Sequence, residues 1–524
     1  MRATFGARTF MPRTLRPTFP LLTIFLTIGG CQIIGGLEEL RLGDSSGGSG
    51  GLGGGSGGLG GESSSSSVVS SSAGGAGGAG GAGGAGGGPP TTVFWSKRFG
   101  DGSSQSVTDV AVDAMGNVFV VGYFAGTLDF GTGSPLTTAG DTDAFMAKLD
   151  TDGNPLWSLR FGGAGPDRIE SIALTSAGDP IVGGSFGGAF SIDATNFTHA
   201  GGIDGFVIKF SAMDGSLVWN RRFGDAQNQR CASVAVVPNS QDVRCFGDFS
   251  GTVTFSGFTL TSSGLEDLFV TRFGSDGTFV DAVRSGDAQV QTARSMVVDQ
   301  SGARYVTALF DGAIDWGPMP VTSAGAGDVF VGKIQSNATV PWTHRMGDTN
   351  TQKPNALALV GGSGIVLVGE FEGACDLAGN AITSKGKVDA FVARMSDSGA
   401  VSWIRSIGDA NPMMAPDDQH ATDVAATSDG VFVTGYAAGT VDFGSGQVAG
   451  PGDADVFVMR LAPNGQTVWS IRAGSDNPQY GRAIALSGTD AIVVAGEFRG
   501  TLDFGNGPLT SAGSNDVFIV KMTR

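Results

Sequence analysis

The chain has 524 residues, a net charge of −17 and a pI of about 4.5. An acidic chain without a basic stripe is a poor partner for nucleic acid, which attracts proteins mainly through its phosphates. Its three histidines, His199, His344 and His420, are far apart in the sequence, so we expect no metal site and no cofactor.

Residues 1–30 have the pattern of a bacterial export signal. The first 20 positions contain four arginines and no acid, and a short apolar run follows at 21–28. The run is too short to span a bilayer, and small residues precede Cys31. The ending Ile28-Gly29-Gly30-Cys31 resembles the lipobox of bacterial lipoproteins, which implies that Cys31 carries acyl chains and anchors the protein in a lipid bilayer. An ordinary signal peptide with an incidental cysteine is the alternative.

Residues 31–90 are expected to form a disordered tether. From Gly43 to Pro90 they are almost entirely glycine, serine and alanine. Such a segment buries too little apolar surface to offset the entropy lost on ordering. About 48 residues of this kind reach roughly 35–40 Å on average. Together with Cys31, the tether predicts a lipid-anchored protein of the bacterial outer membrane that is displayed at the cell surface.

A tryptophan recurs every 61–66 residues through residues 91–524, with an aspartate once in its place. The seven positions are Trp95, Trp157, Trp219, Asp281, Trp342, Trp403 and Trp469. A unit of this size is too small to bury a core alone and must pack on its neighbours. The spacing therefore predicts one structural unit written seven times.

Each unit has the pattern of four short strands. In the first unit, the alternating segments 107–113 and 118–124 flank a Gly-Asn turn, and a glycine-rich loop follows. Segments 143–149 and 156–161 come next, joined by a turn at Asp152-Gly153. No window has a helical period, and four-stranded antiparallel sheets repeated around an axis are β-propeller blades.

The two ends of the repeat region complete each other. The last unit ends with its third strand at 516–522, and an unattached fourth strand stands at about 92–99. Pairing this N-terminal strand into the last blade would close the ring and leave no exposed edge. We therefore expect an all-β, seven-bladed β-propeller over residues 91–524, present as a monomer.

Two segments carry a family resemblance. Leu149–Trp157 and Val112–Gly122 resemble the repeat of SBBP-type bacterial β-propeller proteins, and the resemblance covers all of 91–524. It implies a secreted or surface-attached propeller without an assigned chemistry. The Gly-x-x-x-Trp spacing also resembles that of PQQ-type propellers. It implies that four tryptophans pack between blades, without a cofactor role: Trp157, Trp219, Trp403 and Trp469.

Two aspartate positions also recur. One begins an Asp-x-Phe-x-x-Lys/Arg pattern at Asp143, Asp204, Asp267, Asp328, Asp389, Asp455 and Asp516. The other lies in the glycine-rich loops at Asp129, Asp193, Asp315, Asp376, Asp442 and Asp503. We expect a carboxylate present in every unit to satisfy loop amides or to bridge to an arginine of the next blade. Structural calcium is the alternative, and it is not predicted.

A polar residue stands before each innermost strand. The set is Gln105, Asp167, Gln229, Gln291, Gln352, Gln419 and Gln479. Seven such side chains could ring one mouth of the central channel and bind a carbohydrate or a peptide. The alternative is that they cap the exposed ends of the inner strands.

Unit six breaks the symmetry with an insertion at 411–420, which contains Met413, Met414 and His420. Flexible methionine-rich loops suit adaptable contacts. With Arg230 and Tyr480, these residues complete the predicted ligand-binding face. A solvated insertion without a role is the alternative.

Cys231 and Cys245 lie on adjacent predicted strands, offset by about three residues. An exported protein permits a disulfide between them, and the offset leaves the bond open.

The preferred function is a non-catalytic binding module for an unknown protein or glycan. No catalytic residue is assigned, because no nucleophile or acid pair stands outside the repeat except the neighbours Asp417 and Asp418. A periplasm-facing scaffold in outer-membrane protein assembly is the first alternative. A propeller hydrolase or lyase is the second.

Overall fold

The computed structural model describes residues 92–524 apart from 318, 363, 410–417 and 453. Cys31, the predicted signal peptide and the tether lie outside the described residues, as do Met413 and Met414. The described residues form strands and turns, and no helix among them is long and apolar enough to cross a membrane.

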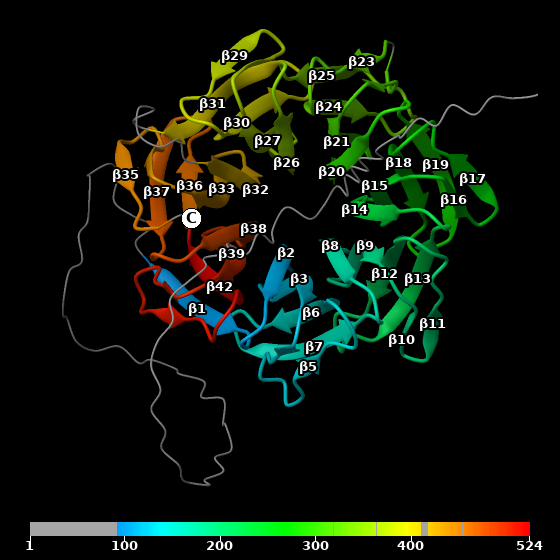
Figure 1. The fold of residues 1–524 in the computed structure, drawn as a ribbon, viewed down its shortest axis with the longest axis horizontal. Coiled ribbons are helices and arrows are strands. Elements are labelled where there is room, and N and C mark those ends of the chain that lie inside the picture. The colour runs from blue at the N-terminus through cyan, green and yellow to red at the C-terminus, as the bar shows by residue number, and fades with distance from the viewer. Residues whose placement is uncertain (1–91, 318, 363, 410–417, 453) are drawn as a thin grey trace, which may run out of the picture. The chain divides into compact units, whose positions relative to one another are not determined.

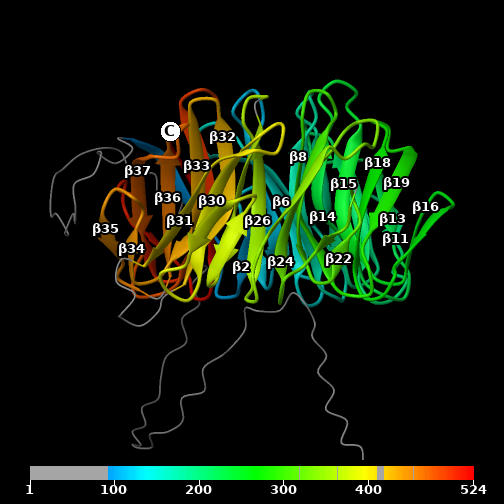
Figure 2. The same ribbon diagram turned by 90° about the horizontal axis from the view of Figure 1, so that it is seen from above.

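Seven four-stranded antiparallel blades surround a common axis, as Figure 1 shows from one end and Figure 2 from the side. The innermost strands, in blade order 1 to 7, are β2 (Gln105–Val112), β8 (Asp167–Leu174), β14 (Gln229–Val236), β20 (Gln291–Val298), β26 (Gln352–Leu359), β32 (Gln419–Thr427) and β38 (Gln479–Ser487). The second strands are β3 (Val118–Phe124), β9 (Pro180–Phe186), β15 (Val243–Phe249), β21 (Arg304–Phe310), β27 (Gly364–Phe371), β33 (Gly430–Ala437) and β39 (Ala491–Phe498).

The third strands are β6 (Asp143–Leu149), β12 (Asp204–Phe210), β18 (Asp267–Phe273), β24 (Asp328–Ile334), β30 (Asp389–Ser396), β36 (Asp455–Leu461) and β42 (Asp516–Thr523). The outermost strands are β7 (Pro155–Phe161), β13 (Leu217–Phe223), β19 (Phe279–Ser285), β25 (Trp342–Met346), β31 (Val401–Asp409), β37 (Thr467–Ala473) and β1 (Val93–Phe99). The predicted all-β, seven-bladed architecture is confirmed.

The termini close the ring as predicted. Strand β1 pairs antiparallel with β42, with Trp95 opposite Lys521 and Arg98 opposite Phe518. The backbone N–H of Thr523 also donates to the carbonyl of Thr92 at 3.0 Å. Blade 7 therefore combines the first and the last strand of the propeller.

The glycine-rich loops differ from the prediction, because each folds as a small hairpin between the second and third strands of its blade. The hairpins are β4 (Thr127–Leu128) with β5 (Leu136–Thr137), β10 (Phe190–Ile192) with β11 (Thr195–Phe197), β16 (Thr252–Phe255) with β17 (Phe258–Thr261), β22 (Ala313–Ile314) with β23 (Val321–Thr322), β28 (Ala374–Leu377) with β29 (Asn380–Thr383), β34 (Thr440–Asp442) with β35 (Gln447–Ala449), and β40 (Thr501–Leu502) with β41 (Leu509–Thr510). Two of them add to the outermost strand of the preceding blade, through β25–β28 and β31–β34.

The hydrophobic core is divided among the interfaces between blades. One cluster joins Phe119 and Phe161 of blade 1 to Ile169, Phe186 and Phe206 of blade 2, all almost fully buried. Equivalent clusters join the other neighbours, because a blade has two apolar faces and each must be covered by the next blade.

The alternating strand directions define two faces of the propeller. Tight turns between first and second strands, and between third and fourth strands, lie on one side, which we call the turn face. The innermost strands begin on the opposite side, which we call the loop face.

Candidate functional site

The polar residue at the start of each innermost strand is buried, with an exposed fraction of 0–1%. Gln291 is typical: its Nε2 donates to Asp287 Oδ1 at 2.9 Å and to the Asp311 carbonyl at 2.8 Å. Asp167, the one carboxylate of the set, accepts the backbone N–H groups of Gly163 and Gly187. Burial raises the pKa of Asp167 to about 7, and the charge of Asp143 adds to the rise.

The same pattern holds for the other members of the set, Gln105, Gln229, Gln352, Gln419 and Gln479. The burial of these seven side chains disagrees with the predicted polar mouth. Groups of the surrounding loops occupy most of their polar atoms, and Gln105 Oε1 and Gln419 Oε1 have no hydrogen-bond partner among the described residues. The geometry favours the alternative role of capping inner strands.

The first repeated aspartate is also buried in every blade. In six blades its carboxylate accepts the backbone N–H of the residue four positions earlier, as Asp143 does from Ala139 at 2.9 Å; in blade 6 that residue is Pro451, which has no N–H. In six blades it pairs with an arginine on the outermost strand of the same blade, as in Arg222–Asp204 at 3.2 Å, and in blade 5 Ser406 stands at the arginine position. The suggested bridge from this aspartate to the next blade is therefore wrong. Among the described residues, no group of three or more His, Cys, Asp or Glu side chains is placed to hold a metal ion.

The repeated tryptophans pack between blades. The Trp219 indole N–H donates to the carbonyl of Ser275, in the turn between the third and fourth strands of blade 3. In the same turn, a Cβ built on Gly277 would lie only 2.8 Å from the Trp219 ring. The Gly-x-x-x-Trp spacing thus pairs the tryptophan of one blade with the turn glycine of the next. Trp157, Trp403 and Trp469 are also packed between blades.

A ring of charged and aromatic side chains surrounds the axis near the loop face; we call it the axis ring. It is formed by the partly exposed second and fourth residues of innermost strands and by the side chains opposite them on second strands. Its members are Tyr123, Arg168, Glu170, Arg230, Asp248, Arg294, Lys353, Glu370, His420, Tyr436, Tyr480, Arg482 and Glu497.

Arg230 lies on the blade 3 side of the axis ring. Its Nη2 is 2.7 Å from Asp248 and its Nη1 is 4.0 Å from Glu170 of blade 2. Nη2 also donates to the carbonyl of Ala293 in blade 4 at 3.1 Å. This guanidinium therefore links three blades, and its pKa is raised by Asp248 and Glu170 against the effect of burial.

His420 and Tyr480 lie on the opposite side of the axis ring, one on each side of Tyr436 in the chain of ring contacts. Both rings contact Tyr436, with centroid distances of 4.4 Å for His420 and 4.8 Å for Tyr480. The Arg482 guanidinium lies 4.8 Å from the centre of the Tyr480 ring and 5.7 Å from that of Tyr436. His420 Nδ1 also contacts Glu370. Burial acts to raise the pKa of Glu370, but His420 and Lys353 outweigh it, so this pKa lies below its ordinary value.

Sequence reasoning found Arg230, His420 and Tyr480 but missed Glu370 and Tyr436. These two occupy one position of the second strand, which changes type from blade to blade and also holds Tyr123, Ser185, Asp248, Leu309 and Glu497. The signal in the sequence was that this one position varies between units, whereas its neighbours in the strand largely repeat.

Closer to the middle of the innermost strands, the fifth strand residue in blades 1, 2, 3, 4 and 6 accepts a hydrogen bond from the backbone of the next blade. Ser171 Oγ accepts the Val234 N–H, and Ser233 Oγ accepts that of Met296. Asp109 and Asp423 replace serine in blades 1 and 6 and accept from Ile172 and Ile484. Burial raises the pKa of Asp109 to about 6. Burial and the charge of Asp109 raise that of Asp423 to about 8.

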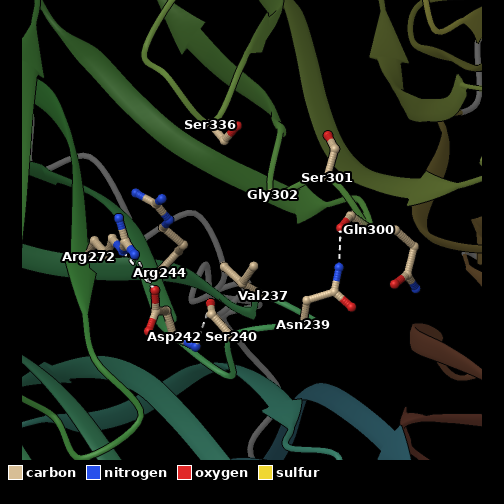
Figure 3. Close-up of a pocket in the computed structure, with 10 residues that line it drawn as sticks. All are labelled: Val237, Asn239, Ser240, Asp242, Arg244, Arg272, Gln300, Ser301, Gly302 and Ser336. Atoms are coloured by element: carbon tan, nitrogen blue, oxygen red, sulfur yellow. Dashed lines mark hydrogen bonds and ion pairs between the residues drawn. The ribbon is translucent and has the colours of Figure 1, made fainter.

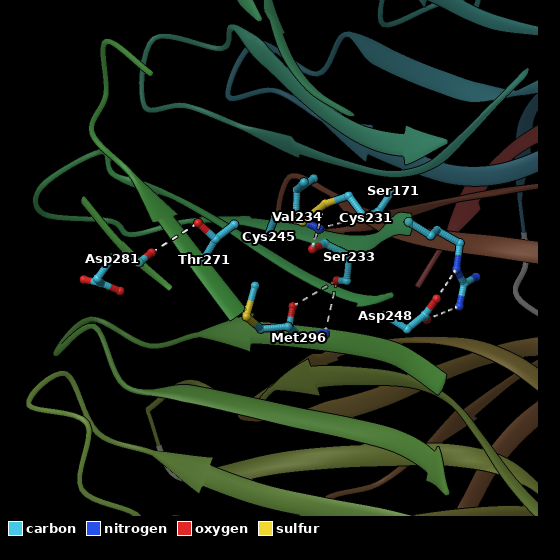
Figure 4. The surroundings of a disulfide bond; sticks show 10 residues. Ser171, Cys231, Ser233, Val234, Cys245, Asp248, Thr271, Asp281 and Met296 are labelled. Atoms are coloured by element: carbon cyan, nitrogen blue, oxygen red, sulfur yellow. Dashed lines mark hydrogen bonds and ion pairs between the residues drawn. A yellow bond between two sulfur atoms is a disulfide. The ribbon is translucent and has the colours of Figure 1, made fainter. Parts of the chain in front are cut away.

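Blade 3 contains a disulfide between Cys231 and Cys245, whose Cα atoms are 5.9 Å apart (Figure 4). The strand register places Cys231 opposite Gly247 and Cys245 opposite Val234, so the bond runs diagonally across the predicted offset. Gly183 of blade 2 leaves room for it, because a Cβ there would lie 2.7 Å from Cys231 Sγ.

A cavity of about 220 Å³ opens between the turns of blades 3 and 4, on the turn face (Figure 3). Its walls include Asp242, Arg244 and Arg272 of blade 3 and Ser301 and Ser336 of blade 4. Arg272 Nε donates to Asp242 Oδ2 at 2.8 Å. Sequence reasoning had placed its candidate ligand site on the other face.

Comparison with known proteins gives distant similarities, and no family model matches the chain. Regulatory protein FlaEY of Caulobacter vibrioides is 25% identical over 340 residues, covering 58% of this chain and 33% of that protein. An uncharacterized WD repeat-containing protein of Acanthamoeba polyphaga mimivirus is 26% identical over 148 residues, covering 25% of this chain and 10% of its own. A solved polysaccharide lyase, described as an ulvan lyase, has a TM-score of 0.39 at 10% identity, covering 80% of this chain and 97% of that one.

The chain thus spans a third or less of the length of FlaEY and of the WD repeat-containing protein. The blades and their closure define it as a seven-bladed β-propeller, a fold that supports an interaction module. The similarities supply no evidence of a reaction.

Proposed function

We propose that the chain is a lipid-anchored binding module at the surface of the bacterial outer membrane, and that its axis ring takes a protein or glycan ligand. One contrast carries the proposal. Buried positions repeat from blade to blade, whereas the partly exposed second residue of the innermost strand changes, through Ser106, Arg168, Arg230, Thr292, Lys353, His420 and Tyr480. Repeated residues maintain the fold, so a position released from the repeat is free to serve recognition.

The chemistry of the axis ring suits a polar ligand with flat apolar surfaces. Tyr480, Tyr436 and His420 offer aromatic faces of the kind that pack against sugar rings or peptide side chains. Near them, acidic and basic side chains form ion pairs, as Arg482 does with Glu497 at 2.6 Å. Such a surface supplies both donors and acceptors in fixed positions.

Site-specific photocrosslinking in intact cells tests the site. A photoreactive amino acid at Tyr480 should capture a discrete ligand, whereas the same group at Met115 should not. Met115 is a matched control because its side chain is 76% exposed on a tight turn of the opposite face. His420→Ala should reduce capture from position 480. Equal capture from both positions would remove the axis ring as the binding site.

Protease treatment of intact cells tests the location. The anchor and tether predict that the full chain is shaved from the surface while periplasmic proteins stay intact. Protection of the chain until the outer membrane is opened would instead favour the periplasm-facing scaffold.

A further inference from the structure

Two arginines break the repeat beside the cavity between blades 3 and 4. Arg244 is the second residue of its strand and pairs with Arg272 of the third strand. The other six blades have apolar or aromatic residues at this position: Phe119, Ile181, Tyr305, Val366, Phe432 and Val493. Arg304 stands one position earlier in its strand, where the other blades have Val118, Pro180, Val243, Ile365, Val431 and Ile492.

The tryptophan that closes other interfaces is missing at the same place. Asp281 replaces it in blade 3, and Ala338 replaces the turn glycine of blade 4 that would face it. At four other interfaces the indole N–H donates to a turn carbonyl six residues before the next tryptophan-column position, as Trp219 does to Ser275. The equivalent residue in blade 4 is Ser336, which lines the cavity. The cavity therefore lies where a tryptophan would otherwise dock.

The arginines are buried but incompletely paired within the described residues. Arg244 is 4% exposed, its Nε has no hydrogen-bond partner there, and Asp281 is 3.6 Å from its Nη1. Arg304 is 3% exposed, its Nε also lacks a hydrogen-bond partner, and no carboxylate among the described residues is within ion-pair distance. Arg272 is held by Asp242.

Three guanidinium groups thus face two carboxylates, Asp242 and Asp281, in a chain with a net charge of −17. Burial lowers the pKa of Arg244, and burial together with the Arg244 charge lowers that of Arg304 to about 10. A buried cation without full compensation is costly, and an anion in the cavity would offset that cost.

We propose that the cavity between blades 3 and 4 is a binding site for a small oxyanion group, with Arg244 as its main ligand. Guanidinium N–H groups match the oxygen geometry of carboxylate, sulfate and phosphate. Ser336, which also lines the cavity, adds a neutral hydroxyl donor, whereas the Ser301 hydroxyl already donates to Asp299 at 2.6 Å. The volume of about 220 Å³ holds such a group with a few waters, since one water occupies roughly 30 Å³. The site lies on the turn face and does not depend on the function proposed for the axis ring.

Titration calorimetry of the full chain with sodium phosphate, sodium sulfate and sodium acetate tests the site, with sodium chloride at matched ionic strength as the reference. We expect at least one of the three oxyanions to bind and to raise Tm beyond the chloride control. The pattern among the three separates a tetrahedral dianion from a monocarboxylate as the preferred group.

Arg244→Val installs a residue of the type found at this position in other blades, so it should fold and should weaken binding at least about tenfold. Arg304→Ile should weaken binding less, because Arg304 does not line the cavity. Arg221→Ala is the matched control, since Arg221 lies over Trp219 at the neighbouring interface, and it should leave binding unchanged. Oxyanions that act no differently from chloride would overturn the proposal, as would a folded Arg244→Val protein with undiminished affinity.

Discussion

The interfaces on the two sides of blade 3 use the same backbone positions in different ways. Between blades 2 and 3, Trp219 covers Gly277 and donates to the Ser275 carbonyl, which leaves the contact almost fully buried. Between blades 3 and 4, Asp281 and Ala338 stand at the matching positions, and a cavity lined by arginines opens beside them.

The tryptophan of one blade and the turn glycine of the next therefore form one structural unit that spans two blades. The glycine has a positive φ, and in Gly277 it also lacks the Cβ that would strike the indole ring. Ala338 keeps the positive φ, at 68°, but has no tryptophan against it. The indole ring is therefore lost at Asp281 of blade 3 at the same interface where a Cβ is gained at Ala338 of blade 4.

The largest expected difference comes from truncating the tryptophan position on each side. Trp219→Ala should destabilise the protein by about 3–5 kcal/mol, because it leaves a large hole between blades 2 and 3. Asp281→Ala should cost less, about 1–2 kcal/mol, because its side chain is 49% exposed but pairs with the buried Arg244 at 3.6 Å. Urea unfolding of both variants measures the contrast, and similar losses would contradict it.

Replacing buried Arg304 with an apolar residue, as found at this position in the other blades, should raise the stability of the protein rather than lower it. Arg304→Ile should stabilise the protein by about 1–3 kcal/mol, because a poorly compensated buried cation is replaced by an apolar side chain. Thermal and urea unfolding in chloride buffer measure it. Ile365→Val, at the matching position of blade 5, is the control for repacking and should cost about 0.5–1.5 kcal/mol.

Near the axis, the contacts between blades also differ in their residue type. Ser171 and Ser233 accept hydrogen bonds at the two interfaces of blade 3, whereas blades 1 and 6 use Asp109 and Asp423, so the stability of these contacts should depend on pH. The folded pKa of Asp423 is raised to about 8 from an ordinary value of 3.8, so the folded state binds this proton more tightly than the unfolded state. Its stabilising contribution is complete below about pH 4 and is lost as pH rises through 8.

Asp423→Asn keeps an acceptor for the Ile484 N–H and removes the titration. At pH 8 it should therefore be more stable than the parent by several kcal/mol, and at pH 4 nearly equal to it. Unfolding curves between pH 4 and pH 8 check the prediction. If stability depends on pH in the variant as it does in the parent, Asp423 is not the cause of that dependence.

The smallest effects come from the turn residues, and they should have opposite signs. Gly277→Ala places a Cβ 2.8 Å from the Trp219 ring at a positive φ and should cost about 1–2 kcal/mol. Ala338→Gly relieves the positive φ and should stabilise by about 0.5–1 kcal/mol. Paired melting curves distinguish them, and equal signs would refute the two-blade unit.

The blade architecture could be predicted because its signals recur in every unit. Tryptophan spacing, turn glycines and the strand left over at 92–99 each fix one part of the ring. The short hairpins were missed because a strand such as Thr127–Leu128 has only two residues, too few to show a period.

The candidate site was harder to predict for a physical reason. A glutamine that caps a strand and one that binds a ligand are the same residue in the same place, so Gln291 could not be assigned without its partners Asp287 and Asp311. Arg244 and Arg304 do depart from the repeat, but that departure is visible only once the strand register is known.

The pairing of β1 with β42 also sets an order of assembly. Within the propeller, residues 93–99 are synthesised before every other strand, whereas their partner strand β42 is the last propeller strand to be made. During synthesis, this strand remains unpaired, with its N–H and C=O groups unsatisfied by the sheet. Completion of blade 7 is consequently a long-range step that couples the whole ring, and a nascent chain is exposed to mispairing with a second copy until that step is complete.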